Sequence, residues 1–194
     1  NYIVAYSHEK IKPNKKEVIE MDISIEEVIK NADNKEYALQ VLKEQGKMLE
    51  FVSSELQDDE EIVKTALTQD GEALEFASDR LKGKKDIVLL AIKTAPWTAF
   101  YASESLKADK ELIMKSAKDC GQTLYYASKE LRDDEDVVKA AVANKGIIIK
   151  YASYRLRNNK EIAQIAMEQD KRAYQFLTKE LKEDEEIKAL KDAK

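Results

Sequence analysis

A hydroxyl side chain recurs every 25 residues, and it is the most regular candidate for chemistry in the sequence. The positions are Ser53, Ser78, Ser103, Ser128, Ser153 and Thr178. A hydroxyl becomes a nucleophile only when a neighbouring base takes its proton. The single histidine, His8, is not part of the repeating pattern, which leaves no Ser-His-Asp or Cys-His arrangement. We therefore expect these hydroxyls to bond to the backbone or to a neighbouring helix, and we expect no catalytic residues.

Acidic clusters and the single cysteine are the other side chains that could do chemistry. Residues 58–61 and 133–136 could hold a divalent cation weakly, but neither cluster has EF-hand spacing. Carboxylates at these places would instead cap helices and match the helix dipole. Cys120 precedes Gly121 at the expected end of a helix, where no helix N-terminus activates the thiol. We expect no metal, no cofactor and no enzymatic activity.

The serines belong to a longer motif that repeats without an insertion. An aromatic residue, an apolar residue, serine or threonine and, three residues later, leucine recur together, as in Tyr126-Ala127-Ser128-Lys129-Glu130-Leu131. The aromatic positions of the motif are Phe51, Phe76, Tyr101, Tyr126, Tyr151 and Phe176. A constant period of this length is typical of stacked helical repeats.

Each period predicts two short helices. The first helix follows a column of capping residues, with an acid two positions later that suits the positive end of the helix dipole. This column holds Asn34, Asp59, Lys84, Asp109, Asp134, Asn159 and Asp184. Apolar residues then recur with a helical period, as at Ile62, Val63 and Ala66.

Glycine or proline separates the two helices of a period. Gly46, Gly71, Gly121 and Gly146 hold this position, and Pro96 holds it once. We expect the glycines to end the first helix in the left-handed conformation, and the proline to stop it by lacking an N–H. The second helix is expected to run from about Gly71 to Leu81. Its buried stripe would hold Leu74, Ala77, Ser78 and Leu81.

The fold class predicted is all-α, an α-solenoid of about six to seven stacked short helical hairpins with a 25-residue period. Short helices of this kind are unstable alone, but stacked neighbours bury their apolar faces. Residues 33–194 would form the hairpin array as a single continuous domain. Residues 1–32 are irregular, and we expect a divergent N-terminal helical cap there, with a capping box at Ser24 and Glu27.

The repeats resemble those of domain-of-unknown-function family 4116. The resemblance rests on Tyr-Ala-Ser…Leu followed by a basic residue, one or two aspartates, an acid, Ile or Val, Val and Ala, and residues 126–134 carry it best. It covers residues 33–190. The resemblance implies tandem helical repeats and no assigned activity, so it supports the fold and says nothing about function.

Composition argues against several classes of protein. The net charge of −5 argues mildly against a general nucleic-acid binder, and one cysteine gives no disulfide framework. No stretch approaches the roughly 20 apolar residues of a membrane-spanning helix, and the first residues lack a signal-peptide pattern. We expect a cytoplasmic protein with no membrane partner.

A basic residue follows the motif leucine in most periods. Lys82, Lys107, Arg132, Arg157 and Lys182 form this basic ladder, with Gln57 as the exception. In a stacked array the ladder would line one edge and could offer a track to a polyanion or nucleic acid. Alternatively, each cation only stabilises the end of its own helix and lies near the acids of the next one.

The outward face of the second helix differs between periods. The outer periods are polar there, whereas the three central periods carry Trp97, Phe100, Tyr125, Ile147 and Tyr154. Tyr125 holds the Phe100 column in the next period, so the two should lie about 8–10 Å apart. An exposed aromatic strip is typical of a protein-binding hot spot. Alternatively, these side chains fold onto the solenoid or are scattered exposed apolar residues.

The leading hypothesis is a non-enzymatic binding module that holds a protein or peptide between Trp97 and Tyr154. Residues 51–75 carry eight acids and one lysine, net −7, which would suit a partner with a basic, apolar segment. One alternative is polyanion or nucleic-acid binding along the basic ladder, although the net charge does not favour it. The other alternative is a structural spacer or a homo-oligomer.

Overall fold

Helices account for all regular structure in the part of the chain that the computed structural model describes, residues 23–192. No strand occurs in that range. Within it, long helices recur at the predicted period: α2 (Lys35–Glu44), α4 (Glu60–Gln69), α6 (Lys85–Ala91), α8 (Lys110–Asp119), α10 (Glu135–Asn144), α12 (Lys160–Gln169) and α14 (Glu185–Asp192). The predicted all-α repeat fold is confirmed.

The segment between two long helices consists of two pieces, and not of the single second helix that the sequence predicted. The first pieces are 3-10 helices, with one short α-helix among them: η1 (Gly46–Phe51), η2 (Gly71–Phe76), η3 (Pro96–Tyr101), α9 (Thr123–Tyr126), η5 (Gly146–Tyr151) and η6 (Lys171–Phe176). The second pieces are single turns: α3 (Ser54–Gln57), α5 (Asp79–Lys82), α7 (Glu104–Lys107), η4 (Leu131–Asp133), α11 (Tyr154–Arg157) and α13 (Lys179–Lys182).

The break between the two pieces falls at the small residue and serine of the motif. Ala77 and Ser78 are extended, with ψ of 154° and 157°. Ser78 is the N-cap of α5, and its Oγ accepts a hydrogen bond from the Leu81 N–H at 3.2 Å. The prediction of one helix from Gly71 to Leu81 is wrong because apolar residues three and four apart fit a 3-10 helix plus a capped turn equally well.

The predicted capping column of the long helices forms as expected. Asp59 Oδ1 accepts hydrogen bonds from the N–H groups of Glu61 and Ile62, at 2.9 and 3.2 Å. Asn or Asp side chains cap α2, α8, α10, α12 and α14 in the same way. Lys84 has no side-chain acceptor, and α6 begins without such a bond. Each of these caps stabilises its helix by about 1 kcal/mol.

The glycine column is required by close stacking, and not by the left-handed helix ending that we predicted. No glycine of the chain has φ in the left-handed region, and the helix before Gly71 ends at Asp70 with φ of −147°. A Cβ on Gly71 would collide with the Ala91 carbonyl oxygen of the next unit. The Gly71 N–H donates to Thr94 Oγ1 of that unit at 2.9 Å. Equivalent bonds join Gly46 to Gln69, Gly121 to Asn144 and Gly146 to Gln169.

Pro96 replaces this glycine once, in a locally different arrangement. Proline has no N–H to donate. In the next unit Asp119 holds the column whose side chain accepts the glycine N–H elsewhere in the array. Ser116, which is fully buried, donates to the Pro96 carbonyl at 2.7 Å and shares a 2.5 Å hydrogen bond with Thr123 Oγ1. Buried hydroxyls therefore join this unit to the next.

Adjacent units are held together by a continuous apolar core and by rows of polar bonds. The Ser103 N–H donates to the Lys82 carbonyl of the preceding unit at 3.1 Å, and this bond repeats along the array. Lys110 Nζ lies 2.8 Å from Asp134 and 2.9 Å from Asp136 of the next unit. Exposed ion pairs contribute roughly 0–1 kcal/mol each. Burial of leucine and isoleucine side chains in the shared core is therefore the main source of cohesion.

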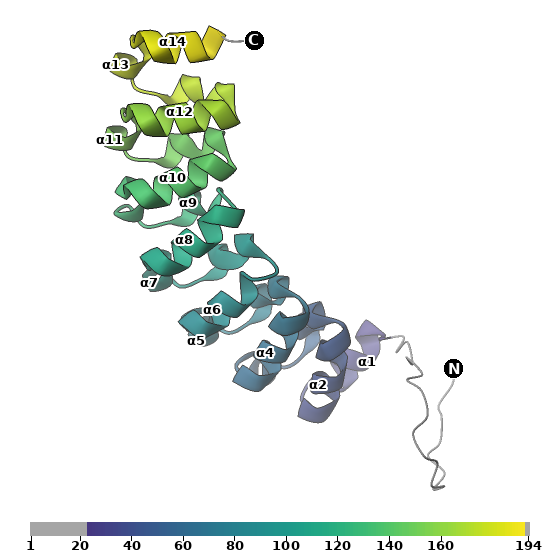
Figure 1. The fold of residues 1–194 in the computed structure, drawn as a ribbon. Coiled ribbons are helices and arrows are strands. Elements are labelled where there is room, and N and C mark those ends of the chain that lie inside the picture. Colours follow the sequence, from purple (N-terminus) through teal and green to yellow (C-terminus); the bar gives the residue numbers. More distant parts are fainter. Residues whose placement is uncertain (1–22, 193–194) are drawn as a thin grey trace, which may run out of the picture.

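Figure 1 shows the units stacked into a curved rod, with α1 (Ile25–Lys30) and α14 at opposite ends. The single turns α5, α7, α11 and α13 follow one edge of the rod. Ser24 is the N-cap residue of α1, but its side chain makes no capping bond, so the predicted capping box does not form. Residues 1–22, which include His8 and most of the predicted cap, lie outside the described residues, and the cap stays a prediction. No helix of residues 23–192 has the length and apolar character needed to cross a membrane.

Candidate functional site

Aromatic side chains of η3, α9 and η5 form one continuous row across three units. This aromatic ladder runs in the order Trp97, Tyr101, Phe100, Tyr126, Tyr125 and Tyr151. Successive ring centroids lie 6.0, 5.0, 4.7, 4.9 and 4.7 Å apart. The ring planes are tilted or edge-on to each other, as aromatic pairs prefer.

The local backbone turns the outer rings of the ladder toward solvent. Residues three apart share a face of a 3-10 helix, so Trp97 and Phe100 lie on one face of η3. Thr98 and Ala99 lie between them and are buried. Trp97, Phe100 and Tyr125 are 39%, 43% and 52% exposed. The ladder therefore presents apolar rings on a backbone that the core holds in place.

The motif tyrosines make the ladder continuous, which the sequence analysis missed. Tyr126 lies between Phe100 and Tyr125, although the predicted strip did not include it. The signal in the sequence was the aromatic dipeptide at residues 100–101 and again at 125–126. In the other units a charged or amide residue precedes the motif aromatic residue, so two aromatic rings do not follow one another there.

Tyr101 is the most strongly perturbed group of the ladder. Burial, and after it the Glu75 carboxylate, raise the pKa of Tyr101 to about 12. Lys82 Nζ lies over the same ring, 6.0 Å from its centroid. Tyr101 is therefore neutral near pH 7, and its ring supports the exposed Trp97 and Phe100.

Tyr154 lies apart from the ladder, although the sequence placed it on the same face. The extended Ala152 and Ser153 separate η5 from α11, where Tyr154 lies. Its hydroxyl donates to Glu180 of the next unit at 2.8 Å, and the Arg157 guanidinium lies 5.8 Å from its ring centroid. The predicted strip is therefore interrupted before its last member.

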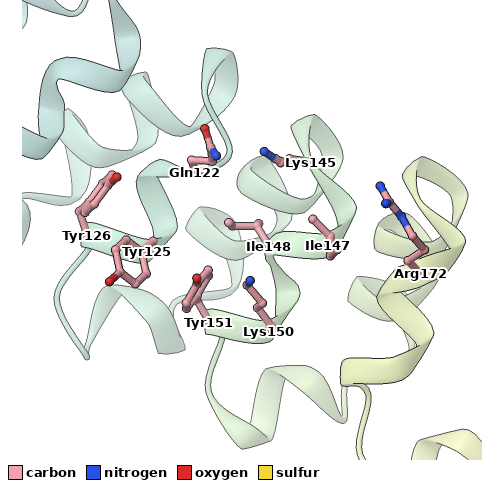
Figure 2. A pocket seen from close by; sticks show the side chains of 9 residues that line it. All are labelled: Gln122, Tyr125, Tyr126, Lys145, Ile147, Ile148, Lys150, Tyr151 and Arg172. Carbon is pink, nitrogen blue, oxygen red and sulfur yellow. The ribbon is translucent and has the colours of Figure 1, made fainter.

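A groove continues the ladder toward the C-terminal units. It has a volume of about 470 Å³ and crosses α9, η5 and η6 (Figure 2). The rings of Tyr125 and Tyr151 lie side by side at one end of the view in Figure 2. Ile147, which the sequence singled out, and its neighbour Ile148 also line the groove. The ladder and the groove thus form one surface.

Three cations complete the lining of the groove, and none of its lining residues is acidic. These are Lys145, Lys150 and Arg172. Lys150 Nζ lies 4.8 Å from the Tyr151 ring centroid. Arg172 pairs with Asp170 at 2.8 Å, and the guanidinium lowers the pKa of that carboxyl. Neither lysine forms an ion pair within residues 23–192, and Lys150 Nζ also lies 5.9 Å from the Phe176 ring centroid.

The members of the basic ladder are half-buried, and four of the five lie against a ring or a carbonyl group. Lys107 Nζ lies 5.6 Å from the Phe100 ring centroid, and Lys182 Nζ donates to the Gln175 carbonyl at 2.8 Å. Gln57, the exception in the column, donates in the same way to the Leu49 carbonyl at 3.0 Å. The column therefore has a structural role, and binding of a polyanion along it stays a prediction.

Three of the six recurring hydroxyls, those of Ser78, Ser153 and Thr178, bond to a side chain of the preceding unit. Ser78 Oγ donates to Asp58, and Ser153 Oγ donates to Asp133, in each case 20 residues earlier. Within residues 23–192, no cluster of three or more His, Cys, Asp or Glu residues could hold a metal ion. Cys120 is the half-exposed C-cap residue of α8, at the helix end where it was predicted.

The fold and this surface define a class of protein: an all-α tandem repeat in which short helical units stack and side chains vary on one face. The model of the family described as Domain of unknown function (DUF4116) matches residues 34–82, 84–132 and 134–182. These matches span most of the chain, which therefore belongs to this family. Each match covers two of the 25-residue units. Comparison with curated proteins and with solved structures gave no match.

Proposed function

We propose that the chain is a non-enzymatic binding module that holds a protein or peptide segment along the aromatic ladder and the adjoining groove. The observation that carries this proposal is the exposure of Trp97, Phe100 and Tyr125 within one continuous row of rings. Stacking of the units does not require these rings. Lys47 and Glu50 hold the columns of Trp97 and Phe100 in an earlier unit, and that unit stacks on its neighbour with the Gly46 N–H bonded to Gln69.

The physical properties of the ladder suit recognition of a partner. Tryptophan and tyrosine are the residues most enriched among those that dominate binding energy at interfaces. Rings that already touch one another lose little conformational freedom when a ligand covers them. The entropic cost of ordering these side chains on binding is therefore small. Ladder and groove together give an extended apolar track with polar groups at its edge, which fits a segment of polypeptide.

Other functions have weaker support. Polyanion binding would use the basic ladder, but its cations are half-buried, and four of the five lie against a ring or a carbonyl group. A spacer would not need exposed rings in three successive units. A cytoplasmic location belongs to the same proposal and rests on composition, and cell fractionation would test it.

Selection of short random peptides on the immobilised chain tests the proposal. We expect selected peptides to bind the wild type and to lose affinity for the Trp97→Ala, Phe100→Ala double variant by about tenfold or more, since truncated hot-spot residues cost about 2 kcal/mol each. Far-UV circular dichroism must show that the variant keeps its helices.

A matched control changes the same two columns in an earlier unit. The Lys47→Ala, Glu50→Ala double variant should bind selected peptides like the wild type, because neither residue belongs to the ladder or the groove. Peptides that bind all three proteins equally would exclude the aromatic ladder as the binding site.

A further inference from the structure

We infer that the groove beside Tyr151 takes an acidic peptide segment, in which carboxylates flank one apolar side chain. This inference rests on the proposed function and specifies the class of partner. It reverses, for the groove, the expectation of a basic partner that residues 51–75 suggested.

The lining of the groove is rich in positive charge. Lys145 and Lys150 bring two ammonium groups without a carboxylate partner among residues 23–192, and the third cation, Arg172, is shared with Asp170. The chain as a whole carries a net charge of −5, so a groove lined by three cations and no acid stands out from its background. The carboxylates of an acidic partner would complement these charges, and the same cations would repel a basic partner.

The charge of the same face changes from unit to unit along the array. Asp70 and Glu75 hold the columns of Lys145 and Lys150 three units earlier, and Glu72 holds the column of Arg172 four units earlier. The face is thus acidic in the unit of η2, aromatic in the next two units and basic at the groove, whereas the unit of η1 carries Lys47 and Glu50 in these columns. An acidic segment would be repelled from the unit of η2, so the charges favour its placement at the groove.

Part of the groove lining is apolar. Ile147 is half-buried, and the rings of Tyr125 and Tyr151 lie side by side, so a single apolar side chain of the ligand would find contacts there. Desolvation at these rings would strengthen the nearby charge pairs, because Lys150 Nζ lies only 4.8 Å from the Tyr151 ring centroid.

Fluorescence anisotropy with labelled synthetic peptides tests this inference. The probe is a short peptide with glutamates around one central phenylalanine, and its comparison peptides carry glutamine or lysine in place of every glutamate. We expect the glutamate peptide to bind the full chain about tenfold or more tighter than the glutamine peptide. Its affinity should also fall with ionic strength.

Charge reversal locates the site. The Lys145→Glu, Lys150→Glu double variant should bind the glutamate peptide at least about tenfold more weakly than the wild type. The control is Lys43→Glu, Lys118→Glu, which changes the net charge equally at two exposed lysines outside the groove. The control should bind nearly as the wild type does, and loss of affinity in the control would show that net charge alone decides binding and would overturn the inference.

The remaining outcomes separate this inference from the proposed function. If the glutamine or lysine peptide binds as tightly as the glutamate peptide, or library peptides that need Trp97 are not enriched in acids, the acidic partner is wrong and the proposed function stands. If no library peptide binds the face, both are wrong. If light scattering shows two chains in the absence of peptide and the groove variant restores one, the occupant is a second copy and the inference is overturned.

Discussion

Replacement of Gly146 by alanine tests the stacking of the units most sharply. An added Cβ would collide with the carbonyl oxygen of Ala166 and lie 3.0 Å from the backbone nitrogen of Asp170. Both atoms belong to the end of α12, which cannot rotate away as a flexible side chain could. The η5 segment and α12 must therefore separate, and the bond from the Gly146 N–H to Gln169 weakens.

The expected cost follows from three terms. Overpacking at a rigid contact costs about 1–3 kcal/mol, and the weakened hydrogen bond costs about 1 kcal/mol. The stiffer unfolded chain of the variant returns about 0.5 kcal/mol. The free energy of unfolding of the Gly146→Ala variant should therefore be about 1.5–3.5 kcal/mol below that of the wild type.

Gly83→Ala is the matched control in the same chain. Gly83 has φ of −86°, and the nearest atom to an added Cβ would be the Arg80 carbonyl oxygen at 3.3 Å. The same position in the next unit is Ala108, with a similar φ of −98°. This variant should be as stable as the wild type or more stable by about 0.5 kcal/mol.

Urea unfolding followed by circular dichroism measures both variants. With a slope of roughly 2 kcal/mol/M, the midpoint for Gly146→Ala should fall by about 1 M. Equal midpoints for Gly146→Ala and the wild type would refute the argument that the glycine column exists for close approach. Equal destabilisation by Gly83→Ala would refute it as well, because a general cost of losing glycine would then explain both.

Two further predictions concern buried polar groups in the central units. The Ser116→Ala variant should lower the free energy of unfolding by about 1–2 kcal/mol, because it removes the hydrogen bonds to the Pro96 carbonyl and to the buried Thr123 hydroxyl; urea unfolding with an unchanged midpoint would contradict this. Because the pKa of Tyr101 is raised to about 12 when folded, its neutral form stabilises the fold below pH 10, and this contribution is lost as pH rises from about 10 to 12. Absorbance titration should show one tyrosinate that forms near pH 12. In the Glu75→Gln variant the pKa of Tyr101 should stay raised, because burial is the larger cause. A return of this pKa to its ordinary value in the variant would show that the carboxylate, and not burial, causes the shift.

The sequence predicted the long helices well because their signals are local. The capping side chains at Asp59 and the equivalent positions act within one turn, and the apolar period of α4 needs no knowledge of the neighbour. The broken second helix was missed because its stripe suits two backbone conformations. The pair Ser78-Asp79 could have indicated the break, because serine followed by an acid is typical of the start of a new helix.

The glycine column and the aromatic ladder could be predicted only in part, because both depend on contacts between units. A glycine suits both a left-handed helix end and a close contact between two backbones. Only the position of Gly71 beside the Ala91 carbonyl oxygen in space shows that the close contact is the reason here. Proline at position 96 was a hint, since its φ is fixed on the negative side. The ladder depends on Tyr126 reaching both Phe100 and Tyr125, which requires the register of neighbouring units.

Trp97 is the only tryptophan of the chain, so its fluorescence reports directly on the proposed binding face. The most direct test adds a library-selected peptide whose binding requires Trp97 and Phe100, while emission and acrylamide quenching are recorded. Because Trp97 is 39% exposed and stands at one end of the ladder, a segment that covers the ladder should shift its emission to shorter wavelength and protect it from quenching. Binding that is evident by anisotropy but leaves emission and quenching of Trp97 unchanged would contradict the account.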